Sequence, residues 1–350
     1  MDLSIAAILA QDGITSGAIY ALLALALVLV FSVTRVIFIP QGEFVAFGAL
    51  TMAALQSNLL PRTAVLLLAL GVLVFAGEAA TCLRTAAARR NAPRRLAGAF
   101  ARLVLAPALL LLLLKVTLAT VLPMPVQILL TLAIVVPMGP LIYRLAFQPL
   151  ADASVLVLLI VSVGVHFALI GLGLVMFGAE GSRTLAFTDA RLTLGSLTIA
   201  GQSIAIVATA LLLIAALYLY FERTLSGKAL RATAVNRLGA QLVGIGTIQA
   251  GRLAFTLAAA IGAICGVLIA PLTTIYYDSG FLIGLKGFVG AIIGGLGSYP
   301  VAAAGAITVG LIEAYASFFA SAFKEVIVFT LIIPILLWRS LTTPHVEEDE

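Results

Sequence analysis

The stretch ITSGAIYALLALALVLVF, residues 14–31, contains no charged residue. An α-helix rises about 1.5 Å per residue, so about 20 apolar residues cross the roughly 30 Å hydrocarbon core of a bilayer. The stretch therefore predicts a membrane-spanning helix. Acidic residues, Asp2 and Asp12, stand where a signal peptide carries basic ones, and no Ala-x-Ala-like site follows. We expect the helix to be retained in the protein.

Composition extends this prediction to the whole chain. Hydrophobic residues make up 63% of the 350 residues, charged residues only 10%, and the mean hydropathy is +1.21. Soluble globular domains do not have this composition. The two cysteines, Cys82 and Cys265, lie in apolar stretches without Cys-x-x-Cys or Cys/His spacing, so we predict neither a disulfide framework nor a metal site.

Apolar runs separated by polar residues, Pro or Gly predict the helices. The sequence indicates an all-α fold, a polytopic membrane helix bundle of about 9–11 transmembrane helices with broken or re-entrant segments. We expect one transmembrane domain over 1–340 and a short acidic tail over 341–350. The candidate spans are 14–33, 43–58, 63–83, 102–122, 126–146, 154–178, 202–222, 252–272, 281–297, 301–320 and 325–338.

The distribution of positive charge predicts the orientation. If the loops between these spans alternate across the membrane, fourteen of the twenty Lys and Arg fall on one side and four on the other. Cytoplasmic loops carry the excess of Lys and Arg, so we place the amino terminus outside and the carboxyl terminus in the cytoplasm. Six of the fourteen lie in the segment 84–102, which we interpret as a topology-fixing loop near anionic headgroups, with a docking role as the alternative.

Residues 222–251, ERTLSGKALRATAVNRLGAQLVGIGTIQAG, form a long loop on the same side. We expect a short helix, a break at Gly239 and a second short stretch. A stripe of small and apolar side chains at helical spacing would fit a groove on a cytoplasmic protein. A solvated amphipathic connector fits the pattern equally well. The stripe consists of Ala229, Leu230, Thr233, Ala234 and Leu238.

Four blocks of short motifs follow one another along the chain. They are GAIYAL at 17–22 with QGEF at 41–44, YR at 143–144 with QPL at 148–150, GKALRA at 227–232 with GI at 244–245, and GLKGF at 284–288 with GGLGS at 294–298 and Gly305. In this order they resemble the branched-chain amino acid (Liv-type, hydrophobic amino acid uptake) permeases. The resemblance covers residues 13–58 and 140–340.

The resemblance implies a permease subunit of an ABC importer in the bacterial cytoplasmic (inner) membrane, without catalytic chemistry of its own. Its implied partners are a second homologous permease, two cytoplasmic ABC ATPases, an extracytoplasmic substrate-binding protein and the lipid bilayer, and no nucleic acid. The chain lacks the phosphate-binding motif GxxxxGK[ST], so ATP and Mg would be used by the partner ATPases and no cofactor is expected here. The implied ATPase-coupling residues are Gly227, Lys228, Ala229, Leu230, Arg231, Ala232, Gly239, Gly244 and Ile245.

The chain departs from the family pattern in three places. Residues 60–125 are interpreted as an inserted pair of helices around the arginine-rich loop, and such a pair restores the original membrane side. Pro40-Gln41 stands where an Ala-His pair is common, and Gly287 replaces an expected Ala. Both substitutions bear on the path lining or the substrate.

Charged groups at membrane depth are costly and usually face a cavity or a partner. We predict that Lys286, in a glycine-rich segment, belongs to a translocation path or gate and pairs with Glu313 or Glu43; the alternative is that it snorkels to an interface. In the inserted pair, Glu78 is expected to pair with Lys115. The predicted path or gate residues are Gln41, Gly42, Glu43, Lys286, Gly294, Gly295, Gly297, Ser298 and Glu313.

Other functions are weighed against this one. An ABC permease for urea or short amides would have a similar sequence. An ion-coupled secondary transporter predicts clustered acids or histidines at the midplane, and the spans hold few. An intramembrane enzyme would have to use Ser162 and His166, one helical turn apart, but no orienting acid lies near them in the sequence. For His166 we favour a hydrogen-bonded packing role over a proton relay.

Overall fold

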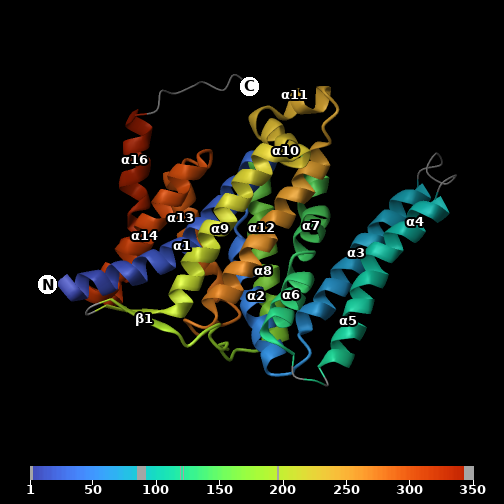
Figure 1. The fold of residues 1–350 in the computed structure, drawn as a ribbon. Coiled ribbons are helices and arrows are strands. Elements are labelled where there is room, and N and C mark those ends of the chain that lie inside the picture. Colours follow the sequence, from blue (N-terminus) through green and yellow to red (C-terminus); the bar gives the residue numbers. More distant parts are fainter. Residues whose placement is uncertain (1–2, 85–91, 119, 121, 195–196, 343–350) are drawn as a thin grey trace.

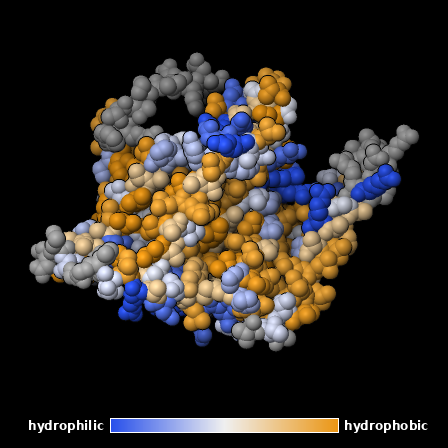
Figure 2. Space-filling view, in the orientation of Figure 1, coloured by the Kyte–Doolittle hydropathy of each residue, from blue (hydrophilic) through white to orange (hydrophobic). Residues whose placement is uncertain are grey.

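The computed structural model describes residues 3–84, 92–118, 120, 122–194 and 197–342 as a helical bundle with one small hairpin (Figure 1). Residues 85–91 of the arginine-rich segment 84–102 and residues 343–350 of the predicted tail lie outside the described residues. Figure 2 shows a largely hydrophobic surface over the body of the bundle, as expected for a protein surrounded by lipid. The predicted fold class is confirmed.

Eight helical stretches in the described part are long and apolar enough to cross a membrane. Each coincides with one of the eleven predicted spans. They run Ser4–Thr34, Arg62–Cys82, Leu96–Thr117, Met124–Leu150, Val155–Phe177, Gly201–Arg223, Thr247–Ile269 and Tyr299–Phe319.

The other three predicted spans form shorter helices. The span 43–58 is the 16-residue α2 (Gln41–Gln56), and 281–297 is the 15-residue α13 (Ser279–Ile293). At about 1.5 Å per residue neither helix reaches across the 30 Å core. The span 325–338 is split at Leu331 into α15 (Lys324–Thr330) and α16 (Ile332–Thr342). The predicted broken segments are therefore present.

The remaining elements have the following bounds. The long helices are α1 (Leu3–Thr34), α3 (Arg62–Arg84), α8 (Val155–Phe177), α9 (Gly201–Arg223), α12 (Thr247–Ile269) and α14 (Tyr299–Phe319). The composite spans contain α4 (Ala92–Phe100), η2 (Ala101–Leu105), α5 (Ala106–Thr117), α6 (Met124–Val135), α7 (Met138–Ile142), η3 (Tyr143–Phe147) and η4 (Gln148–Leu150). Short elements are β1 (Arg191–Leu194), β2 (Leu197–Ala200), α10 (Leu225–Val235), α11 (Arg237–Leu242) and η5 (Ser321–Phe323).

The first helix lies at the centre of the bundle. Its 32 residues give a length of about 48 Å, which exceeds the hydrocarbon core, and Figure 1 shows α1 crossing obliquely. It packs against α14 through glycines: a Cβ placed on Gly310 would lie 2.5 Å from Cα of Gly17. Close contact of this kind stabilises helix pairs in membranes, where lipid provides no hydrophobic driving force between them.

The ends of the helices alternate as predicted. Figure 1 places α10, α11 and the end of α16 at one end of the bundle, and the β1–β2 hairpin at the other. The antiparallel hairpin, with Arg191 opposite Ala200, occupies the loop 180–201, for which no strand was predicted. We call the two ends of the bundle the α10–α11 side and the hairpin side.

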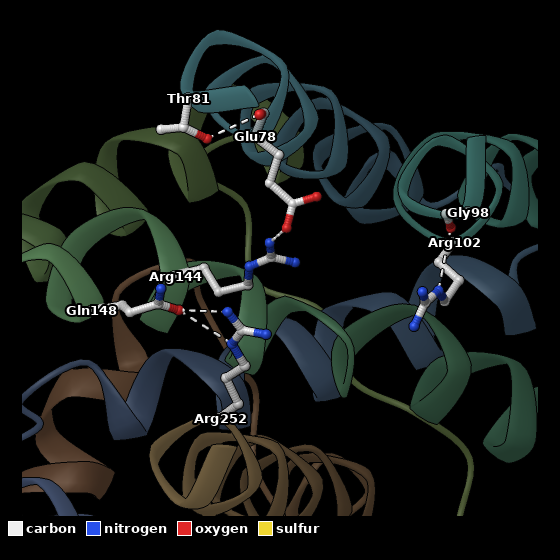
Figure 3. A network of polar contacts seen from close by, with 7 residues as sticks. All are labelled: Glu78, Thr81, Gly98, Arg102, Arg144, Gln148 and Arg252. Atoms are coloured by element: carbon white, nitrogen blue, oxygen red, sulfur yellow. Dashed lines mark hydrogen bonds and ion pairs between the residues drawn. The ribbon is translucent and has the colours of Figure 1, made fainter. Parts of the chain in front are cut away.

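The helical pair interpreted from the sequence as an insertion forms an arm beside the bundle. Helix α3 runs toward the α10–α11 side, and the stretch of α4, η2 and α5 returns (Figure 1). A Cβ on Gly71 would lie 1.9 Å from the Leu103 carbonyl oxygen, so α3 and η2 are in direct contact there. This antiparallel register places Glu78 and Lys115 near opposite ends, and the predicted pairing between them is wrong. Glu78 instead forms an ion pair with Arg144 on η3 (Figure 3).

Candidate translocation path and coupling segment

A buried, non-helical segment leads into the bundle after α1. Arg35 is exposed and has a φ of 60°, and residues 36–40 then run without helix into the interior. Ordinarily, backbone without internal hydrogen bonds is tolerated at membrane depth only where protein surrounds it. Here the backbone N–H of Ile39 donates to the Ser162 hydroxyl oxygen at 2.9 Å. The chain is therefore non-helical in the interval between the predicted spans 14–33 and 43–58.

The first turn of α2 crosses the first turn of α13 inside the bundle. A Cβ on Gly42 would lie 1.9 Å from the carbonyl oxygen of Gly280, so only glycine allows this approach. The side-chain amide of Gln41 donates from Nε2 to the Ala258 carbonyl oxygen at 2.9 Å and ties the same turn to α12. Two helices shorter than the membrane therefore begin next to each other, an arrangement that places helix amino ends along substrate sites in transporters.

Glu43 lies in this crossing and is fully buried. Its Oε1 is 3.1 Å from Nδ1 of His166 on α8, without hydrogen-bond alignment, and neither carboxylate oxygen has a hydrogen-bond partner among the described residues. The His166 ring packs on Phe281 in the first turn of α13, with centroids 4.7 Å apart. At the start of α13, Asp278 is exposed. An acid therefore does lie beside His166, although it is distant in the sequence.

Lys286 sits in a second cluster. Its Nζ is 2.5 Å from Oε1 of Glu313 on α14 and 3.1 Å from Oε1 of Glu325 on α15. The Tyr20 hydroxyl donates to the other oxygen of Glu313 at 2.7 Å. The predicted pairing with Glu313 is confirmed, the alternative with Glu43 is wrong, and the lysine side chain, 7% exposed, does not snorkel to an interface.

This cluster lies beside a cleft of about 390 Å³ that Asp12, Ser16 and Glu313 help to line. One ammonium group faces two carboxylates, so the three charges sum to −1. Sequence reasoning did not assign Tyr20 or Glu325 to it, because neither has a local spacing that connects it to Lys286.

The remaining predicted path residues form a turn. Gly294 ends α13, Gly295 and Leu296 have φ values of 64° and 56°, and Ser298 precedes α14. The next residue, Tyr299, packs against Phe221 near the end of α9 with ring centroids 6.0 Å apart. The glycines thus produce a tight connection between two helices, away from the Glu43 crossing.

The segment 222–251 folds into the two predicted short helices. The Thr224 hydroxyl accepts from the Gly227 N–H at 2.9 Å and begins α10, and the Asn236 side chain accepts from the Gly239 N–H at 2.8 Å and begins α11. Gly239 therefore lies within α11, and the break falls at Asn236. Gly244 takes a φ of 85° just before Ile245, and α12 begins shortly afterwards at Thr247.

The exposed face of this segment differs from the predicted stripe. Leu230 and Thr233 are buried against the bundle, where Leu230 packs with Leu29 and Ala254. Helix α10 turns these residues inward because they follow the same face as Gly227, which lies against the end of α9. The large apolar side chains that do face outward are Leu225, Val235, Leu238, Leu242 and Val243. Lys228 and Arg231 are exposed, and Arg231 pairs with Glu222 at 2.6 Å.

Comparison with known families identifies the architecture. Residues 9–336 match the family described as "Branched-chain amino acid transport system / permease component". The chain belongs to this permease family. The match runs through the inserted arm and includes the crossing, the Lys286 cluster and the 222–251 segment.

Individual proteins with similar sequences are permeases of the same kind. The permease is 32% identical over 222 residues to the high-affinity branched-chain amino acid transport system permease protein BraD of Pseudomonas aeruginosa, which covers 60% of this chain and 72% of that protein. It is 31% identical over 206 residues to the LivH proteins of Escherichia coli and Salmonella typhimurium, which bear the same description, covering 56% of this chain and 66% of each. No solved structure gives a significant match.

Proposed function

We propose that this permease is a transmembrane subunit of an ABC importer that moves branched-chain or other hydrophobic amino acids into the cell. The observation that carries the proposal is the family match over 9–336, in a chain whose helices can cross a membrane many times. The names of BraD and LivH specify branched-chain amino acids, and this supports that substrate class over urea or short amides.

The crossing of α2 and α13 is the proposed path. It connects the exposed Asp278 to the buried Glu43 and His166, and the segment 36–40 continues from there toward the α10–α11 side. An amino acid carries an ammonium group. The carboxylate oxygens of Glu43, which have no hydrogen-bond partner among the described residues, offer it a counter-charge. Lys286, Glu313 and Glu325 join three helices beside this path and act in the proposal as a gate that holds α13 against α14 and α15.

The energy source is assigned to other subunits. We propose that α10 and α11, with the exposed residues Leu225, Leu238 and Leu242, sit in a groove on a cytoplasmic ATPase. Since one chain offers one such segment, two permeases would engage two ATPases, and an extracytoplasmic binding protein would deliver the substrate on the hairpin side. In this arrangement the amino terminus is outside and the carboxyl terminus is cytoplasmic.

Reconstitution tests the proposal. The full chain is placed in proteoliposomes with its partner permease, ATPases and binding protein, and uptake of labelled leucine, urea and acetamide is compared with and without ATP. ATP-dependent uptake of leucine is the expected result. Uptake of urea or acetamide alone would assign the other substrate class, and leucine uptake driven by an ion gradient without ATP would contradict the ABC assignment.

A further inference from the structure

A cleft of about 760 Å³ opens between the inserted arm and the bundle. One wall comes from the end of α3 and from the stretch of α4 and η2; the other comes from η3, η4 and the first turns of α12. These chain segments all lie toward the α10–α11 side (Figure 1). Figure 2 shows hydrophilic side chains gathered in the notch between arm and bundle, above a hydrophobic surface.

Three arginines and one glutamate line this cleft. Arg144 pairs with Glu78, which leaves two guanidinium groups without a carboxylate partner among the described residues. Arg252 donates from Nε and Nη2 to the neutral Gln148 side-chain oxygen, at 3.1 and 2.8 Å, and Arg102 donates from Nε to the Gly98 carbonyl oxygen at 3.2 Å. The lining therefore has a net charge of +2.

The geometry brings two of these positive charges toward each other, while Arg102 lies apart on the arm side of the cleft. Figure 3 shows Arg144 and Arg252 extending toward the same space from different elements, and the two guanidinium groups repel each other. Arg102 and Arg144 both lie on π-helical turns, η2 and η3, which are rare and occur frequently at functional sites. Concentrated like charge is costly without a counter-ion, so the cleft is complementary to an anion.

The rest of the lining selects the kind of anion. Leu73 and Leu145, which also line the cleft, are 58% and 38% exposed, and the neighbouring Phe100 and Leu105 are exposed as well. A cleft lined by guanidinium groups and by exposed apolar side chains matches a molecule with an anionic head and hydrocarbon tails. A free phosphate ion would use only the cationic part.

We propose that this cleft binds the phosphate group of an anionic phospholipid from the leaflet on the α10–α11 side, with Arg102 and Arg252 as its ligands. The forked guanidinium group of arginine binds phosphate oxygens through paired, charge-assisted hydrogen bonds. Glu78 on α3 pairs with Arg144 on η3 and so ties the arm to the bundle beside this site. The inserted helices thereby supply one wall of a lipid site, and this assignment is independent of the substrate that the permease carries.

Lipid retention tests the proposal. The full chain is purified in nanodiscs of phosphatidylcholine with a minor fraction of phosphatidylglycerol, transferred to detergent, and examined by native mass spectrometry. We expect wild type to retain phosphatidylglycerol, and Arg102→Gln/Arg252→Gln to retain about tenfold less. Arg94→Gln, which removes an exposed arginine of α4 outside the cleft, is the matched control and should retain as much as wild type.

Further variants and a competition experiment separate the other outcomes. Arg102→Lys/Arg252→Lys keeps the charge and should recover part of the retention, and Arg102→Gln alone, at an exposed position, should lower it in a protein that folds normally. Equal retention by wild type and the double glutamine variant would overturn the proposal, as would equal loss of phosphatidylcholine. Displacement of the lipid by millimolar inorganic phosphate would assign the cleft to a small anion instead.

Discussion

The Nδ1 atom of His166 lies 3.1 Å from Oε1 of Glu43 and connects α8 to the first turn of α2. One helical turn earlier on α8, Ser162 accepts the N–H of Ile39. Two polar side chains on one face of α8 therefore fix both the end of the non-helical segment and the start of the helix that follows it. We infer that the shape of the proposed path depends on α8, although the glycines that permit it lie on α2 and α13.

If Glu43 and His166 act as a unit, their substitutions will not be additive. Glu43→Gln alone should lower leucine uptake by about tenfold, the usual effect of losing one charged contact. His166→Asn should have a similar effect, and the double variant should be no worse than either single one. Uptake is measured in proteoliposomes that contain equal amounts of assembled complex. Effects that multiply in the double variant would show that the two residues act independently.

The contact between Gly42 and Gly280 predicts a steric effect. A methyl group on Gly42 would overlap the Gly280 carbonyl oxygen, so Gly42→Ala should separate α2 from α13 and lower the free energy of unfolding by about 1–3 kcal/mol or more. Thermal unfolding of the purified protein measures this. Gly164→Ala on α8 is the control, because nothing lies within 4 Å of its added Cβ. Equal stability of the two variants would contradict the close crossing.

The sequence predicts features that depend on residues close together in the chain better than contacts between distant helices. The apolar runs were enough to locate all eleven helical segments, because a run of apolar side chains favours the membrane interior whatever its neighbours are. The pairing of Lys286 with Glu313 was also predictable, because few charges are available at membrane depth. The contacts of Glu43 with His166 and of Glu78 with Arg144 were not, since they depend on how distant helices align. The inward face of Leu230 depends similarly on how α10 lies against α9.

The Lys286 cluster predicts an asymmetric response to charge removal. Lys286→Met leaves Glu313 and Glu325 close together and only partly exposed without their cation, so stability should fall by about 3–5 kcal/mol. Adding Glu313→Gln to that variant should restore part of the loss. Melting temperatures of the purified proteins test both expectations. Lys115→Met, at an exposed lysine of α5, serves as the control and should melt like wild type. A stable Lys286→Met protein would show that the cluster adds little to the fold.

Substitutions on the exposed face and on the buried face of the segment 222–251 should have different effects. Leu238→Asp/Leu242→Asp changes exposed side chains, so the protein should insert and melt normally but lose copurification of the ATPase subunits. Leu230→Asp places a carboxylate in a buried apolar contact and should lower the melting temperature as well. Retention of the ATPases by the Leu238/Leu242 variant would remove this face from the proposed interface.

The proposed orientation predicts which cysteines an impermeant reagent reaches. In a Cys82→Ser/Cys265→Ala background, Leu225→Cys places a thiol at an 87% exposed position on the α10–α11 side, and Leu185→Cys places one at a 72% exposed position on the hairpin side. Because fourteen of the twenty basic residues belong to the loops that the sequence predicts on the same side as the segment 222–251, that side should be cytoplasmic. A charged maleimide should then label Leu185→Cys in intact cells or spheroplasts and Leu225→Cys only in inverted vesicles, and denatured samples of both confirm that each thiol is reactive. The reverse pattern would invert the topology, and it would place α10 and α11 where no ATP-hydrolysing partner could reach them.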